Sequence, residues 1–345
     1  MANTHRALCV TGNPHRRRTL RRTLQAVGSA VDFTEASGVT GWTGPKPDLL
    51  VLDKDARKDL DLALLGAQFG ESTKIVVLGE SLDDASTVSL LRQHSLDHLI
   101  ADADDPDDAE LVITTVKLVR NDIFGLEKYL AWGVMVHEKD IGGYTDKRGV
   151  LLEIAEYAKE AGARRQAVAR IESVADELLM NALYDAPAVR YGVRARIGER
   201  ARAGLGPLGN ESAKVRYACD GRYFALSVRD NYGELTKEAI LDNLARARAE
   251  RGSPRIASGE GEGAGLGLYF ILSAVTRFIA NIQPGVATEV VCLFDIKATG
   301  RESDACARSL HIFTTSGEPP AAREGGDASP VNVPTVRDPN GKPRS

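Results

Sequence analysis

The stretch from Gly259 to Leu268, Gly-Glu-Gly-Glu-Gly-Ala-Gly-Leu-Gly-Leu, is the part of this chain best suited to bind phosphate. Glycine reaches positive φ angles and has no Cβ, so ligand oxygens can approach the backbone N–H groups closely. The apolar run that follows predicts a helix from about Gly265, whose first N–H groups and positive dipole end face the loop. A phosphate chain fits such a helix start, and a flexible linker without a ligand is the alternative.

Two further stretches carry polar groups that a nucleotide site needs. Glu177 and Asn181 are four residues apart on a strongly periodic helical segment, so their side chains lie on one face of it. The apolar residues between them suit the wall of a cleft better than an open surface. Asp230 and Gly233 follow a strand-like run, Tyr223–Arg229, in which apolar residues alternate with more exposed positions.

In chain order these stretches read Glu-x-x-x-Asn, then Asp-x-x-Gly-x-Leu, then Gly-x-Gly-x-Gly-Leu. The succession resembles the N, G1 and G2 boxes of the GHKL superfamily, which includes gyrase, the large heat-shock chaperone, histidine kinases and anti-sigma-factor serine kinases. The resemblance covers residues 150–315 and implies an α/β two-layer sandwich, the Bergerat fold, that binds ATP and Mg²⁺.

The resemblance also implies a role for each matching residue. Asp230 would accept a hydrogen bond from the adenine amino group, where guanine has a carbonyl, and Gly233 would let the backbone approach the base. Asn181 would supply an oxygen ligand to Mg²⁺. Glu177 would be the general base that takes a proton from water or from a substrate hydroxyl. Three glycines would line the phosphates: Gly263, Gly265 and Gly267.

Among the subfamilies, the resemblance is closest to stand-alone serine-kinase-like ATPase domains that regulate partner proteins. Two features depart from them. One is a long basic stretch at 186–214, either a contact to a nucleotide or acidic partner, or a solvated insertion. The other is the single glycine of Asp230-Asn-Tyr-Gly, where a second glycine often follows. Two functions stay open: an ATP-dependent kinase acting on a Ser or Thr of a protein partner, and a non-catalytic ATP-gated binding module.

Residues 1–122 alternate short apolar runs with helical patterns, which predicts a doubly wound parallel sheet. This region resembles a response-regulator receiver domain, with Asp53 at the end of the third strand in the place of the phospho-accepting aspartate. The partner positions for that chemistry hold other residues: Thr11, Gly12, Gly79 and Ala101. Phosphoryl transfer to a carboxylate needs a cation held by oxygen ligands. We therefore expect a pseudo-receiver that acts as a docking module, with Asp53 an ordinary strand-end residue.

The chain divides into four segments: 1–122, a connecting helix or linker at 123–149, 150–315, and a disordered tail at 316–345 rich in Pro, Gly and charge. The connection carries apolar residues that predict packing between the domains, with a homodimer contact as the alternative: Phe124, Leu126, Tyr129, Leu130 and Trp132. His137 in the same segment superficially resembles a phospho-accepting histidine. It lacks the paired helices that would present one.

The composition excludes several classes of protein. With 345 residues and a net charge of −4, the chain has no global attraction to nucleic acid or to an anionic membrane. Its longest apolar run, Leu266 to Val275, is too short to span a bilayer, and its start lacks a signal-peptide core. The cysteines form no C-x-x-C pair, which favours free thiols. We expect a cytoplasmic protein.

Overall fold

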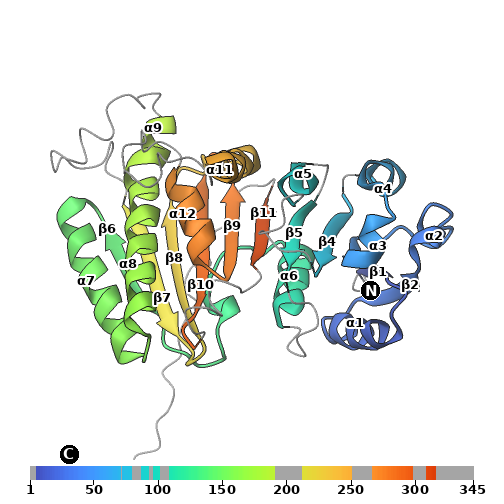
Figure 1. The fold of residues 1–345 in the computed structure, drawn as a ribbon, viewed down its shortest axis with the longest axis horizontal. Coiled ribbons are helices and arrows are strands. Elements are labelled where there is room, and N and C mark those ends of the chain that lie inside the picture. The colour runs from blue at the N-terminus through green and yellow to red at the C-terminus, as the bar shows by residue number, and fades with distance from the viewer. Residues whose placement is uncertain are drawn as a thin grey trace, which may run out of the picture. The chain divides into compact units, whose positions relative to one another are not determined.

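The computed structural model describes residues 5–70, 72–79, 87–92, 96–101, 109–190, 212–250, 266–297 and 308–315. The strands within these ranges form one mixed sheet of 11 strands, in the order β2-β1-β3-β4-β5-β11-β9-β10-β8-β7-β6, with helices packed against it (Figure 1). Residues 1–315 form one compact unit. The tail expected at 316–345 lies outside the described residues. The fold is therefore mixed α/β.

The N-terminal half holds five strands that pair in parallel with one another, in an order common among doubly wound sheets. These strands are β1 (Arg6–Val10), β2 (Ala30–Thr34), β3 (Leu49–Asp53), β4 (Lys74–Leu78) and β5 (Leu96–Ile100). The helices of this half are α1 (Pro14–Ala26), α2 (Ala36–Val39), α3 (Lys54–Lys58), α4 (Leu62–Phe69), α5 (Thr87–Arg92) and α6 (Ala109–Arg120). Residues of β3 are buried throughout because helices cover both faces of a parallel sheet.

The C-terminal half holds an antiparallel run of five strands, β6-β7-β8-β10-β9. The bounds are β6 (His137–Ile141), β7 (Ala213–Cys219), β8 (Tyr223–Asp230), β9 (Arg277–Gln283) and β10 (Ala287–Asp295). The last strand, β11 (Ser309–Thr314), pairs in parallel with β9 and antiparallel with β5. The two halves therefore share one sheet through β11.

Helices cover one face of this C-terminal half (Figure 1). They are α7 (Tyr144–Glu160), α8 (Arg165–Met180), α9 (Ala186–Arg190), α11 (Lys237–Glu250) and α12 (Leu266–Ala274), with a π-helical turn η2 (Asn181–Asp185) between α8 and α9. Their apolar side chains pack with the facing residues of the sheet in one large cluster that includes Leu178, Leu226 and Val290. This layer carries the residues singled out from the sequence.

The opposite face of the same strands is covered by α6 and by the segment after it. A 3-10 turn, η1 (Leu126–Tyr129), packs there in a separate apolar cluster with Val291 and Phe313. The packing role expected for the connection is confirmed for four of its five apolar residues: Phe124, Leu126, Tyr129 and Leu130. Trp132 is fully exposed instead.

Residues 137–149, assigned from the sequence to the connection, form edge strand β6 and the start of α7. The sequence of β6, His-Glu-Lys-Asp-Ile, has no apolar alternation, so nothing local marks it as a strand. It is held in the sheet by antiparallel pairing with β7, and only Ile141 is buried. The His137 ring stacks on Tyr217, with centroids 5.1 Å apart, which gives this histidine a packing role.

Within the ranges that the structure describes, no helix is both long and apolar enough to cross a bilayer. Cys9 and Cys292 are buried free thiols, and Cys219 is half-buried. Burial raises the pKa of Cys9 to about 12, so its thiol stays protonated and unreactive near neutral pH.

Candidate functional site

Glu177 and Gly267, which are 90 residues apart in the sequence, lie against each other where α8 meets α12. A Cβ built on Gly267 would lie 1.5 Å from Oε1 of Glu177 and 2.3 Å from its Cδ. The Glu177 carboxyl group therefore fills the space that any side chain at position 267 would need. The fold brings together two residues that the sequence placed in one site.

The surroundings of Glu177 favour its protonated form. Burial raises the pKa of this carboxyl group, the nearby charges of Asp185 and Asp176 raise it further, and Lys147 acts in the opposite direction. Lys147 is itself buried, and its Nζ lies 2.5 Å from Oδ1 of Asp176. A carboxylate with a raised pKa is a stronger base than an exposed one, as proton abstraction near neutral pH requires.

Asn181 lies at the point where the α-helical hydrogen-bonding pattern of α8 gives way to the π-helical turn η2. Single π-helical turns occur often at functional sites. Asn181 is half-buried, and its side-chain amide has no hydrogen-bond partner among the described residues. The turn also contacts β8, so Asn181 and the strand that ends in Asp230 are neighbours.

Asp230 is buried at the end of β8 and binds the loop that follows it. Its Oδ1 accepts hydrogen bonds from the backbone N–H groups of Tyr232 (2.8 Å), Gly233 (3.1 Å) and Thr288 (3.3 Å). Burial raises the pKa of Asp230 more than these three bonds lower it. Within the described part of the chain, all its hydrogen bonds end on Oδ1, which leaves Oδ2 for a ligand.

Thr288 is a site residue that the sequence did not reveal. It lies on β10 directly opposite Asp230, so the two side chains share one face of the sheet. Its Oγ1 is buried and has no hydrogen-bond partner in the described part of the chain. A buried hydroxyl group without a partner costs free energy, which a ligand with a polar edge would recover. Only the register of β8 and β10 could have identified this threonine.

Gly233 is required by the fold itself. Its φ is +67°, and a Cβ there would lie 2.3 Å from the Gln283 carbonyl oxygen and 2.6 Å from the Val286 nitrogen. The loop after Asp230 therefore packs directly on the turn between β9 and β10. A second role for Gly233, to let the adenine base approach the backbone, stays a prediction.

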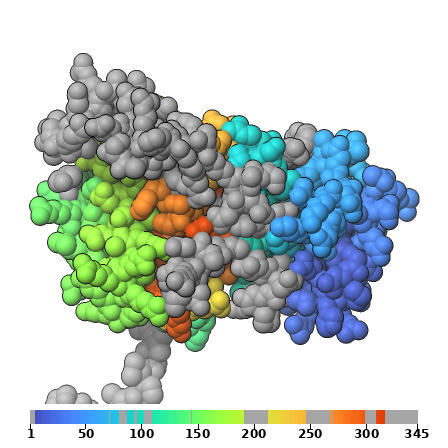
Figure 2. All heavy atoms as spheres, viewed as in Figure 1, coloured from blue at the N-terminus to red at the C-terminus, as the bar shows by residue number. Residues whose placement is uncertain are grey.

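The remaining residues assigned from the sequence are only partly described. Gly263 and Gly265 lie outside the described residues, as does most of the basic stretch 186–214. The helix expected from about Gly265 is present, with α12 described from Leu266 onward. Figure 2 shows α7 and α8 in green and α12 in orange beside one another on one face of the molecule.

Asp53 has a structural role in the N-terminal half. It is buried at the end of β3, and its Oδ1 accepts a hydrogen bond of 2.7 Å from the Ala56 N–H, which caps α3. At the end of β5, the Ala101 N–H donates to Oγ of Ser309, a residue of β11. The described ranges contain no group of three or more His, Cys, Asp or Glu that could hold a metal ion. These contacts agree with the interpretation of Asp53 as a strand-end residue.

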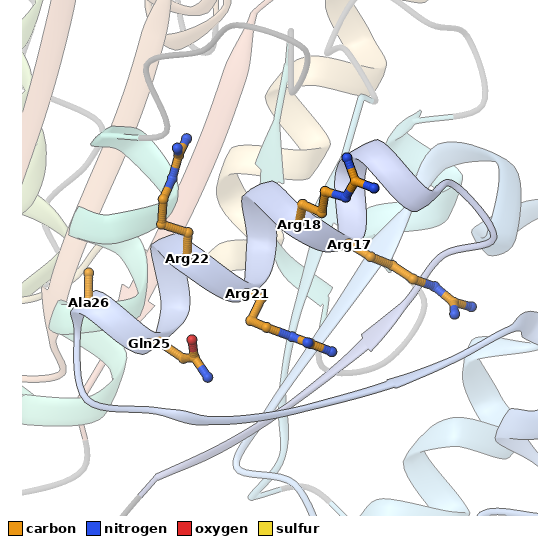
Figure 3. A pocket seen from close by; sticks show the side chains of 6 residues that line it. All are labelled: Arg17, Arg18, Arg21, Arg22, Gln25 and Ala26. Carbon is orange, nitrogen blue, oxygen red and sulfur yellow. The ribbon is translucent and has the colours of Figure 1, made fainter.

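The outer side of α1 carries an open, basic hollow of about 570 Å³ (Figure 3). Arg18 and Arg22 point to one side of the helix, and Arg17 and Arg21 to the other (Figure 3). Arg17 is held by the Thr11 carbonyl oxygen and by Glu35, and the Arg21 guanidinium stacks on the Phe33 ring. The hollow lies on the N-terminal half, away from Glu177 and Asp230 in the sheet order.

The sequence matches no protein family model, and no curated protein matches it at a significant level. Among solved structures, the chain is similar to a chain of the SiaB–SiaC complex from Pseudomonas aeruginosa. The identity is 15%, the match covers 53% of this chain and 99% of the other, and the TM-score is 0.29. A likeness at this level carries no conclusion about the function of this chain.

Proposed function

We propose that this protein binds Mg·ATP between α8, α12, the end of β8 and the start of β10, and uses it to regulate a protein partner. The observation that carries the proposal is the meeting of separate sequence stretches at one face of the sheet. Glu177 touches Gly267, and Asp230 lies opposite a buried Thr288 hydroxyl that lacks a partner. The order of the three motifs supports a GHKL-type ATPase.

The free polar groups fit the proposed ligand. Oδ2 of Asp230 would accept a hydrogen bond from the adenine amino group, and the Thr288 hydroxyl would meet another polar edge of the base. The Asn181 amide oxygen would bind Mg²⁺, since it has no competing partner among the described residues. When bound, Mg·ATP would supply the phosphoryl group for transfer.

We further propose that the activity is that of a protein kinase acting on Ser or Thr. Glu177 lies beside the start of α12, where the phosphates are expected, and its raised pKa suits a general base. It would take the proton from the attacking hydroxyl group of the partner. In this proposal the N-terminal half is a docking module and not a phosphate acceptor, because Asp53 caps α3 and its partner positions hold other residues: Thr11, Gly12, Gly79 and Ala101.

The test separates a kinase from an ATP-gated binding module. Partner proteins recovered by pull-down would be incubated with Mg·ATP and either wild-type protein or Glu177→Gln, and phospho-Ser and phospho-Thr would be measured by mass spectrometry. We expect Glu177→Gln to bind ATP normally and to lower transfer about 10²–10⁴-fold. Glu172→Gln is the matched control, because Glu172 is exposed on the same helix.

An ATP-gated module would give a different result. Partner association would depend on ATP in the wild-type protein and in Glu177→Gln alike, and no recovered partner would carry a Glu177-dependent phosphate. That outcome would overturn the kinase assignment and leave ATP binding intact. Size-exclusion chromatography with light scattering of the same samples would report whether the protein is a homodimer.

A further inference from the structure

A chain of buried polar groups lies on the face of β10 opposite the proposed adenine site. Glu289 is 2% exposed, and its Oε2 accepts hydrogen bonds from the Gly125 N–H (2.8 Å) and from Nδ2 of Asn281 (2.9 Å). Asn281 is the residue opposite Glu289 on β9 and is fully buried. The Glu289 carboxylate is therefore bound to two segments other than its own strand.

Lys117 of α6 completes this chain from the N-terminal half. Its Nζ donates to Oδ1 of Asn281 at 2.7 Å and to the Tyr129 hydroxyl at 2.5 Å, and lies 3.8 Å from the centroid of the Phe313 ring. Burial lowers the pKa of Lys117 to about 6, while the Glu289 charge acts in the opposite direction. Buried ionisable groups are tolerated only when they are held by partners such as these.

The position of this network on β10 links it to the proposed adenine site. Successive residues of a strand point to opposite faces, so Thr288 faces the helices and Glu289 faces α6 and η1. The apolar clusters agree, because Val290 packs with the helical layer and Val291 packs with η1. Thr288 donates its N–H to Asp230 on one side, while Glu289 is anchored on the other.

We propose that Lys117, Asn281 and Glu289 are positioning residues for the proposed nucleotide site, and that they set its preference for adenine over guanine. By anchoring β10 from behind, they fix the distance of the Thr288 hydroxyl and N–H from Asp230. The inference rests on the proposed function, because it concerns the base end of the same site. It also gives α6 of the N-terminal half a direct role in nucleotide recognition.

Arg229 is a charged residue beside this network on the sheet, but it forms no part of the network. Arg229 lies opposite Glu289 on β8, but its guanidinium stacks on the Phe124 ring at 4.4 Å from the centroid. Within the described ranges, the hydrogen bonds to the Glu289 side chain come from Gly125 and Asn281. Loss of the Asn281 amide therefore removes both its bond to Glu289 and the link from Glu289 to Lys117.

The test measures selectivity in the full-length protein. Dissociation constants for Mg·ATP and Mg·GTP would be measured by titration calorimetry in the wild type, Asn281→Leu and Lys117→Met. We expect the preference for ATP over GTP to fall about tenfold in Asn281→Leu, the equivalent of one misplaced hydrogen bond. The preference should also fall in Lys117→Met. Glu289→Gln keeps an acceptor oxygen, so its preference for ATP over GTP should stay within about twofold of the wild-type value.

Val291→Ala is the matched control for a general loss of stability. It lies on the same strand and the same face as Glu289 and is fully buried, but it takes no part in the network. We expect a lower melting temperature and an unchanged ATP-to-GTP ratio. An equal loss of selectivity in Val291→Ala would overturn the positioning role, because any loosening of β10 would then suffice.

The outcomes distinguish this inference from the function on which it rests. A wild-type protein that binds neither nucleotide would refute the proposed ATP site. A wild-type protein that prefers ATP, with the same preference in Asn281→Leu and Lys117→Met, would overturn the positioning role alone. If either substitution prevents folding, the other variant still decides, since Asn281→Leu and Lys117→Met alter different parts of the network.

Discussion

Replacing Gly233 by alanine tests whether the loop after Asp230 packs on the β9–β10 turn as closely as the structure shows. The new Cβ would lie 2.3 Å from the Gln283 carbonyl oxygen, 2.6 Å from the Val286 nitrogen and 2.7 Å from the Gly285 nitrogen. All three are backbone atoms, which cannot move aside as the end of a side chain can. Gly233 also has φ +67°, where an L-residue is strained.

The magnitude follows from two separable costs. A left-handed φ costs alanine about 1–2 kcal/mol, and overpacking against a rigid neighbour typically costs about 1–3 kcal/mol more. Gly233→Ala should therefore lower the free energy of unfolding by about 2–5 kcal/mol. Gly221→Ala is the matched control, because Gly221 has φ +88° and nothing within 4 Å of its would-be Cβ. It should show the φ cost alone.

The assay is denaturation of both variants in urea, followed by circular dichroism under identical conditions. We expect Gly233→Ala to unfold at a clearly lower urea concentration than Gly221→Ala, by the equivalent of at least about 1 kcal/mol. Equal midpoints for the two variants would refute the close approach of the two turns. They would leave the left-handed φ as the one structural reason shown here for glycine at 233, beside the ligand role expected from the sequence.

Three further predictions concern Glu177 and Asp53. Gly267→Ala should displace the flexible Glu177 carboxyl group at a cost below about 1 kcal/mol in stability, which denaturation would measure. It should nevertheless lower ATP turnover to the level of Glu177→Gln, which a phosphate-release assay would measure. Because the folded pKa of Glu177 is raised, its ionisation destabilises the protein as the pH rises from about 4.3 through that folded pKa. Glu177→Gln should therefore melt above the wild type at neutral pH, with the difference disappearing below about pH 4. Asp53→Ala should lower the free energy of unfolding by about 0.5–2 kcal/mol through loss of the α3 cap. Incubation with acetyl phosphate and Mg²⁺ should leave the intact mass of the wild-type protein unchanged. A stoichiometric adduct that is lost in Asp53→Asn would contradict the pseudo-receiver assignment.

Local patterns were enough to predict much of the fold. The hairpin of β7 and β8 turns at Asp220-Gly221 as predicted, with Oδ1 of Asp220 accepting from the N–H groups of Arg222 and Tyr223. The helix predicted at Lys237–Arg251 is α11, Lys237–Glu250. The five parallel strands of the N-terminal half also follow from their apolar runs. Each of these features depends on residues close together in the sequence.

The missed features depend on pairing between distant segments. Thr288 becomes a site residue only through the register of β10 with β8. Lys117 would be read as a solvated helix residue, yet α6 lies on the sheet and buries it. The joining of both halves through β11 required the pairing of His311 with His98, which no local pattern encodes. Sequence periodicity therefore predicts elements better than it predicts which faces they bury.

The central claim is the base contact of Asp230, and calorimetric titration of the wild type and Asp230→Asn with Mg·ATP tests it most directly. The asparagine Oδ1 can keep the three backbone bonds, while its amide replaces the free Oδ2 and presents a donor to the donating amino group of adenine. We predict one ATP bound per wild-type chain and an affinity lower by about 1–3 kcal/mol, roughly 5–150-fold, in Asp230→Asn. Absence of ATP binding by the wild type, or equal affinity in both proteins, would contradict the account.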